Sequence, residues 1–237
     1  MHPDPRPSGM KGPAPTASKA AIDILVRDYA NYHLVFAIGG ALVVMAAFGL
    51  AALSVRALAR LKHTRPAHGI RFARWTYTAA AAAGLLTGAG MAVLVLANLG
   101  NALHPAAGFA DAIKPISGQR APSQRSAVQD AGAAWMASGE AAMPVVLRRA
   151  IEARLAWQAP KAALSLTGLT FAAVFSVQWW NRLLKRARQT LPLSRFALTM
   201  GVAVGCLMAL IVLLLIVLTL ANLQASIAPI VLTLIMG

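Results

Sequence analysis

Residues 71–105 read RFARWTYTAAAAAGLLTGAGMAVLVLANLGNALHP, and residues 195–229 read RFALTMGVAVGCLMALIVLLLIVLTLANLQASIAP. The two windows align without a gap and share 12 identical residues. Two unrelated Ala/Leu-rich helices should share only about five. The identities cluster at the ends, where both windows open with RFA and close with LANL and a proline. This pattern predicts an internal repeat, which defines an architecture and leaves the function open.

The composition is that of an integral membrane protein. The 237 residues are 58% hydrophobic and 12% charged, whereas soluble domains carry about 25% charged residues. The chain contains four charge-free runs, at 29–55, 75–110, 162–181 and 196–237. Each is long enough for a membrane helix, which needs about 20 apolar residues to cross about 30 Å of hydrocarbon. We therefore predict transmembrane helices rather than the buried helices of a soluble protein, at 34–55, 76–99, 162–180 and 197–222.

The net charge of +15 does not indicate nucleic-acid binding, because the 22 Lys and Arg residues lie outside the predicted spans. Basic residues beside spans determine topology and contact anionic lipid. Loops 56–74 and 181–195 are short, basic and free of acidic residues. Their topogenic residues are Arg56, Arg60, Lys62, Arg65, Arg71, Arg74, Arg182, Lys185, Arg186, Arg188 and Arg195. The positive-inside rule places both loops in the cytoplasm and both termini outside.

The basic loops also repeat, with an offset of 126 residues. The matched positions are Arg56, Arg60, Lys62, Thr64 and Pro66 with Arg182, Arg186, Arg188, Thr190 and Pro192. The repeated unit is then a whole hairpin, although two topogenic loops could also converge in composition. Because each unit has an even number of spans, the halves should be related by a two-fold axis along the membrane normal. The predicted fold class is an all-α integral membrane protein with four transmembrane helices as two tandem hairpins, a parallel internal repeat, plus short amphipathic interfacial helices.

The remaining segments complete the predicted organisation. Residues 1–17 are rich in Pro and Gly and should form a disordered tail. Apolar stripes at 18–33 and 144–158 indicate an amphipathic helix before the first and third spans, either lying on the membrane or extending those spans above it. A connector, 106–143, should be mostly irregular over 106–126, with a short helix at 127–138. The first repeat is then 18–105, and the second is 144–237, which ends in an apolar tail.

Small residues recur every four positions on one face of two spans. The second span carries Gly84 and Gly88, and the fourth carries Gly201 and Gly205. Small residues at this spacing let helix backbones approach closely. The pattern predicts helix packing, in a bundle or a dimer.

The sequence contains no recognisable catalytic, metal or cofactor site. All seven acidic residues lie outside the predicted spans, whereas ion-coupled transporters usually bury an ionisable residue. The single cysteine, Cys206, permits no intramolecular disulfide and no cysteine metal site. His33 and His104 lie near one membrane interface, as haem ligands on facing helices would, but the second hairpin has no equivalent pair. We expect no cofactor and no metal.

Asn98 and Asn222 are the repeated polar pair. They occupy equivalent positions at the ends of the second and fourth spans. Across a two-fold axis they could contact each other or a solute. Alternatively, each could bond its own helix or a neighbouring one.

Three function classes follow. The favoured class is a non-catalytic accessory, assembly or scaffold subunit that binds the lipid bilayer and other membrane subunits or itself. The alternative is a small homo-oligomeric transporter or channel for an apolar or neutral solute. A membrane enzyme is a third possibility, but no constellation of acid, base and metal ligand supports it. High Ala and Arg usage suggests GC-rich DNA and therefore a bacterial plasma membrane.

The topology gives a first test, by cysteine labelling in a Cys206→Ala background. A His63→Cys variant should react with a membrane-impermeant maleimide only after the cells are permeabilised, because the basic loops are predicted to be cytoplasmic. Ser123→Cys, in the central connector, is the matched control and should react in intact cells. The opposite pattern of labelling would invert the predicted topology.

Overall fold

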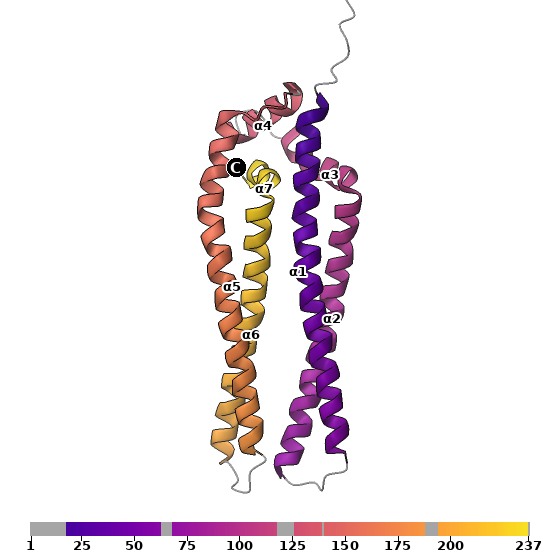
Figure 1. The fold of residues 1–237 in the computed structure, drawn as a ribbon, viewed down its shortest axis with the longest axis vertical. Helices are drawn as coiled ribbons and strands as arrows, with labels where there is room; N and C mark the ends of the chain where they lie inside the picture. The colour runs from indigo at the N-terminus through magenta and orange to yellow at the C-terminus, as the bar shows by residue number, and fades with distance from the viewer. Residues whose placement is uncertain (1–17, 63–67, 118–125, 139, 188–193, 237) are drawn as a thin grey trace, which may run out of the picture.

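The computed structural model describes residues 18–62, 68–117, 126–138, 140–187 and 194–236. These residues form an all-α fold of seven helices (Figure 1). The predicted tail, 1–17, lies outside the described residues. The helices are α1 (Ser18–Leu61), α2 (His68–Leu103), α3 (Pro105–Ser117), α4 (Ala127–Ser138), α5 (Val145–Ala187), α6 (Arg195–Ile227) and α7 (Pro229–Met236).

Four of these helices, α1, α2, α5 and α6, are long and apolar enough to cross a membrane. α1 has 44 residues and α5 has 43. At 1.5 Å per residue each is about 65 Å long, roughly twice the hydrocarbon thickness. Large apolar side chains point outward along the long helices, and Leu86 and Phe171 are 76% and 73% exposed. Such surfaces are suited to lipid contact.

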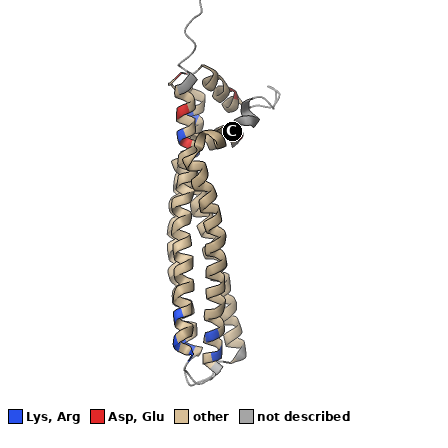
Figure 2. Cartoon of the chain, turned by 90° about the vertical axis from the view of Figure 1, so that its right-hand side faces the viewer, with Lys and Arg blue, Asp and Glu red and all other residues tan. Residues whose placement is uncertain are grey.

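The long helices pair in sequence order as two antiparallel hairpins, α1 with α2 and α5 with α6 (Figure 1). The basic residues beside both loops lie at one end of the molecule, and the described acidic residues lie at the other (Figure 2). The contacts of α1 with α2 and of α5 with α6 confirm the predicted pairing of consecutive spans. The loop residues 63–67 and 188–193 lie outside the described residues.

The small residues lie where the two helices of each hairpin approach closely. A Cβ atom at Gly84 would lie 2.6 Å from the carbonyl oxygen of Ala47, and one at Gly88 would lie 2.8 Å from the Phe48 ring. In the second hairpin, a Cβ at Gly201 would meet the Leu183 side chain at 2.7 Å. A Cβ at Gly205 would likewise meet the Trp180 ring at 2.6 Å. In the described residues these glycines therefore contribute to packing within each hairpin.

At the end opposite the basic loops, five helix segments form what we call the head: α3, α4, α7 and the N-terminal parts of α1 and α5. Its buried core contains Leu25, Phe109, Trp135, Leu147 and Leu234. The sequence predicts amphipathic helices at 18–33 and 144–158, before the first and third spans. In the structure these stretches are continuous N-terminal extensions of α1 and α5. Their apolar stripes face this core, because it offers a closer-packed apolar environment than a membrane surface.

The prediction of a mostly irregular 106–126 is wrong for α3. Pro105 begins this helix, where a proline without an N–H costs no hydrogen bond. Phe109 is 3% exposed in the head core, and this burial stabilises a segment whose local sequence favours a loop. The short helix predicted at 127–138 is confirmed as α4. The expected apolar tail contains α7, which Pro229 begins.

Substitution of Gly84 tests the close approach within the first hairpin. Gly84→Ala should destabilise the protein by about 1–3 kcal/mol, because the new methyl group meets backbone that cannot move without separating α1 from α2. Thermal unfolding in detergent measures the effect. Gly90→Ala is the matched control on the same helix, since a Cβ there has nothing within 4 Å. Equal effects of the two substitutions would contradict the close approach.

Candidate functional site

The two hairpins meet along a seam between α1 and the C-terminal helices α6 and α7. At Gly39, a Cβ atom would collide with the Leu220 side chain. Closer to the head, the Gln224 side-chain amide donates a hydrogen bond of 3.1 Å to the Tyr32 carbonyl. In the head, the Val231 N–H donates to the Asp28 carboxylate at 2.8 Å. The seam is thus apolar at Gly39 and Leu220, near the head ends of the spans, and polar closer to the head.

Asp28 is the only acidic side chain among the buried polar residues of the described chain. It lies in the head, just before the charge-free run of α1, and is 7% exposed. Its carboxylate accepts hydrogen bonds from the backbone at Val231 and Ile230, in the first turn of α7. Burial raises the pKa of Asp28 to about 6, and the backbone hydrogen bonds oppose this shift only in part. α1 therefore supplies the cap that α7 lacks locally.

The predicted polar pair, Asn98 and Asn222, does not meet in the structure as a hydrogen-bonded pair. Each side-chain amide donates instead to the carbonyl four residues earlier in its own helix, Asn98 to Leu94 at 2.8 Å and Asn222 to Leu218 at 2.7 Å. Only Asn98 reaches another helix, where its side-chain oxygen lies 2.8 Å from Nδ1 of His33. That distance fits a donor Nδ1–H, which the neutral Nδ1 tautomer supplies.

His33 is held by an aromatic cluster on α1. The Tyr29 ring packs edge-on against it with centroids 4.4 Å apart, and the Tyr32 ring does so at 5.3 Å. Its ring is therefore oriented by contacts within the head end of the first hairpin. In the described part of the chain, no group of three or more His, Cys, Asp or Glu side chains is arranged to hold a metal ion.

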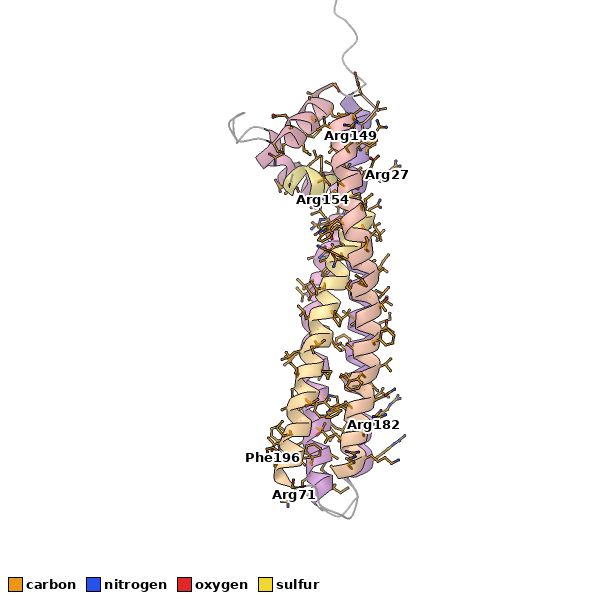
Figure 3. The ribbon with its side chains drawn as sticks, turned by 90° about the vertical axis from the view of Figure 1, so that its left-hand side faces the viewer. Arg27, Arg71, Arg149, Arg154, Arg182 and Phe196 are labelled. Carbon is orange, nitrogen blue, oxygen red and sulfur yellow. The ribbon has the colours of Figure 1, made fainter. Side chains whose placement is uncertain are left out.

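The topogenic residues that the structure describes lie at the loop end of the hairpins, where Figure 3 labels Arg71 and Arg182. Arg74 is also structural, because its guanidinium donates at 2.6 Å to the carbonyl of Leu61, the last residue of α1. The exposed members are Arg56, Arg60, Lys62, Arg71, Arg182, Lys185 and Arg186. Arg65 and Arg188 lie outside the described residues, and Arg195 begins α6.

Sequence reasoning missed two features of the head. Ser126 and Gln129 form a reciprocal capping box at the start of α4: the Gln129 N–H donates to the Ser126 hydroxyl, and the Ser126 N–H donates to the Gln129 side chain. The Ser-x-x-Gln spacing makes this box readable from the sequence. The contact between Asp28 and α7 is not readable, because it joins residues 203 positions apart.

No family model, curated protein or solved structure matches the chain. A function must therefore be argued from the geometry of its residues. By the length and composition of its four long helices the chain belongs to the class of multi-pass membrane proteins, and its described residues form a packed helical head.

The burial of Asp28 predicts that the stability of the head depends on pH. Because its pKa is higher in the folded protein than the ordinary 3.8, folding takes up a proton. Stability should therefore be highest below about pH 4 and fall as the pH rises to about 6, by up to roughly 3 kcal/mol. Asp28→Asn keeps an acceptor for Val231 and stays neutral. It should unfold at a higher temperature than the wild type at pH 7.5 and lack this pH dependence.

Thermal unfolding in detergent, followed by tryptophan fluorescence, measures both effects. Asp28→Ala is the control, because it removes the acceptor together with the charge. It should be less stable than Asp28→Asn at every pH, since the buried Val231 N–H is left without a partner, at a cost of about 1–3 kcal/mol. An unchanged pH profile in Asp28→Asn would mean that another group titrates.

Proposed function

We propose that this chain is a non-catalytic integral membrane subunit that acts in assembly or as a scaffold. One observation carries the proposal: the polar groups that the sequence offers for chemistry are used within the fold. Asn98 and Asn222 bond their own helices, and Asp28 caps α7. Side chains used in this way stabilise the chain and are not free to activate a substrate.

The proposal includes an origin by duplication of a hairpin. α1 and α5 end 126 residues apart, which is the offset of the matching loops. α2 and α6 end 124 residues apart, and α3 and α7 begin 124 residues apart, which is the offset of the matching spans. In the repeat, α1 corresponds to α5 and α2 corresponds to α6. The contact of α1 with α6 therefore corresponds to the contact of α2 with α5, and both contacts are present. These agreements support a parallel repeat with a two-fold axis along the membrane normal.

The orientation belongs to the same proposal. The loop ends of both hairpins carry basic residues, and the described acidic residues lie at the head end (Figure 2). The positive-inside rule then places the loops in the cytoplasm and the head outside, at a bacterial plasma membrane. A scaffold in this orientation would present its folded head to extracytoplasmic partners and its long helices to membrane partners.

The alternative is a small homo-oligomeric transporter or channel for an apolar or neutral solute. One feature of the described chain favours it: Thr219 of α6 is 4% exposed, and its hydroxyl has no hydrogen-bond partner. A free hydroxyl inside the bundle could bind a neutral solute.

Purification of the full chain in mild detergent, with mass spectrometry of everything that co-elutes, tests the proposal. A subunit should retain a different protein at a fixed stoichiometry, because subunit contacts survive mild extraction. Recovery of a homodimer alone, repeated after chemical cross-linking in the native membrane, would contradict the subunit role and favour transport.

A further inference from the structure

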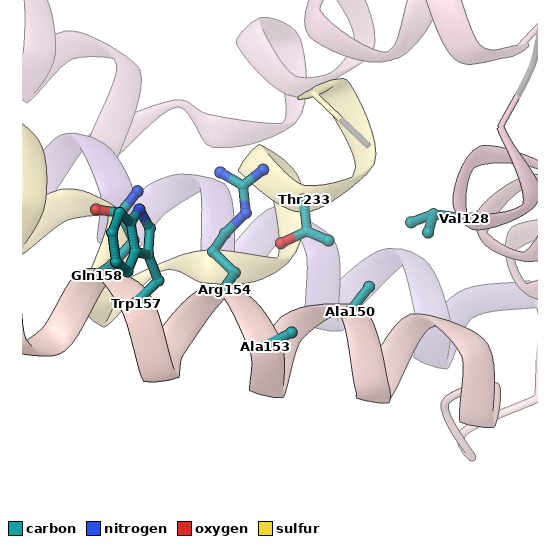
Figure 4. Close-up of a pocket in the computed structure, with 7 residues that line it drawn as sticks. All are labelled: Val128, Ala150, Ala153, Arg154, Trp157, Gln158 and Thr233. Carbon is teal, nitrogen blue, oxygen red and sulfur yellow. The ribbon is translucent and has the colours of Figure 1, made fainter.

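A groove opens between α5, α4 and α7 at the junction of the head and the membrane-facing helices. Its volume is about 530 Å³, and its wall on α5 is formed by residues on one helical face, from Ala150 to Gln158. Val128 of α4 and Thr233 of α7 also line the groove (Figure 4). The groove is shallow and widely open. A ligand could therefore enter it from the bilayer or from water.

The groove holds a cation that the fold does not neutralise. Arg154 is half-buried and extends from α5 toward α7, beside Thr233 (Figure 4). In the described part of the chain, its guanidinium has no hydrogen bond and no ion pair. Arginine carries five donors in a planar fork that suits the oxygens of a phosphate. A half-buried guanidinium without a partner favours an anionic ligand, because burial of an unpaired charge is costly.

A second cation lies toward the membrane. Lys161 packs over the Trp157 ring, with Nζ 4.1 Å from the ring centroid, and it is the last charged residue before the apolar run of α5. Seven residues of helix separate Lys161 from Arg154, which is about 10 Å. The headgroup layer extends about 5–8 Å beyond the hydrocarbon, so both long side chains can reach a phosphate there.

An apolar stripe continues from the groove along α5. Trp157, Leu164 and Phe171 follow one another at intervals of seven residues, and they are 66%, 73% and 73% exposed. Residues seven apart lie on nearly the same face of a helix. A molecule with an anionic head in the groove could therefore lay an acyl chain along this stripe.

From this juxtaposition we propose that the groove is a binding site for an anionic phospholipid. Arg154 and Lys161 bind the phosphate, Trp157 packs against the glycerol region, and the stripe below it contacts an acyl chain. Free phosphate shares the headgroup chemistry but would not use the stripe. The site is distinct from the basic residues Arg71 and Arg182, which lie at the opposite end of the hairpins (Figure 3).

The test uses the purified full chain in a neutral detergent, titrated with phosphatidylglycerol, phosphatidylcholine or inorganic phosphate. Binding is read from the thermal unfolding midpoint and from lipid retained in native mass spectrometry. Phosphatidylglycerol should raise the midpoint and remain bound, and the other two should not. Arg154→Gln should weaken phosphatidylglycerol binding about fivefold, as expected for loss of one interfacial cation. Lys161→Gln should have a similar effect.

Two further variants keep the result interpretable. Arg149→Gln is the matched control, because it removes the same charge from an exposed position of α5 outside the groove, and it should bind as the wild type does. Ala153→Trp keeps both cations and fills the groove, so it should abolish binding even if Arg154→Gln folds poorly. Equal losses in Arg149→Gln and Arg154→Gln, or equal stabilisation by phosphatidylcholine or phosphate, would overturn the proposal.

Discussion

Hydrocarbon offers a backbone N–H or C=O no water to bond, so a chain that enters it must satisfy its own hydrogen bonds. Four helices of this protein meet that condition along lengths that exceed the bilayer. The same constraint explains the extensions of α1 and α5, because the helical hydrogen-bond ladder can continue into water once it has formed. These extensions form part of the head, where α3, α4 and α7 pack against α1, and α4 and α7 pack against α5.

Two different forces then hold the long helices together. Within the first hairpin Gly84 permits backbone contact, and in the second hairpin Gly201 and Gly205 leave room for side chains of α5. Such close packing matters in lipid because apolar burial gives little advantage there. Between the hairpins, α1 contacts α6, and a small apolar cluster of Leu61, Ala73 and Leu184 joins α1 and α2 to α5 at the loop end. The head supplies the larger core. Burial of its apolar side chains stabilises that core. In the described residues, the head therefore contributes the larger of the two apolar clusters that join the hairpins.

Much of the architecture was predictable because it is local. The pairing of consecutive spans follows from charge-free runs joined by short basic loops, and α4 follows from its own sequence. The prediction failed at α3, where Gly and Pro indicate a loop and burial of Phe109 in a distant core stabilises a helix. It was also incomplete at 18–33 and 144–158, where amphipathic stripes fit a membrane surface and a protein core equally well.

The candidate sites also divide into features that the sequence identified and features that only the tertiary structure decided. The repeat identified Asn98 and Asn222, but only the structure gives Asn98 a partner in His33 and leaves Asn222 to its own helix. The sequence by itself determined the number of long helices, their pairing and the charge asymmetry, because hydrophobicity and charge act residue by residue. Tertiary structure alone decided that Asp28 caps α7 and that Arg154 faces a groove. Both depend on segments far apart in the chain, which only packing brings together.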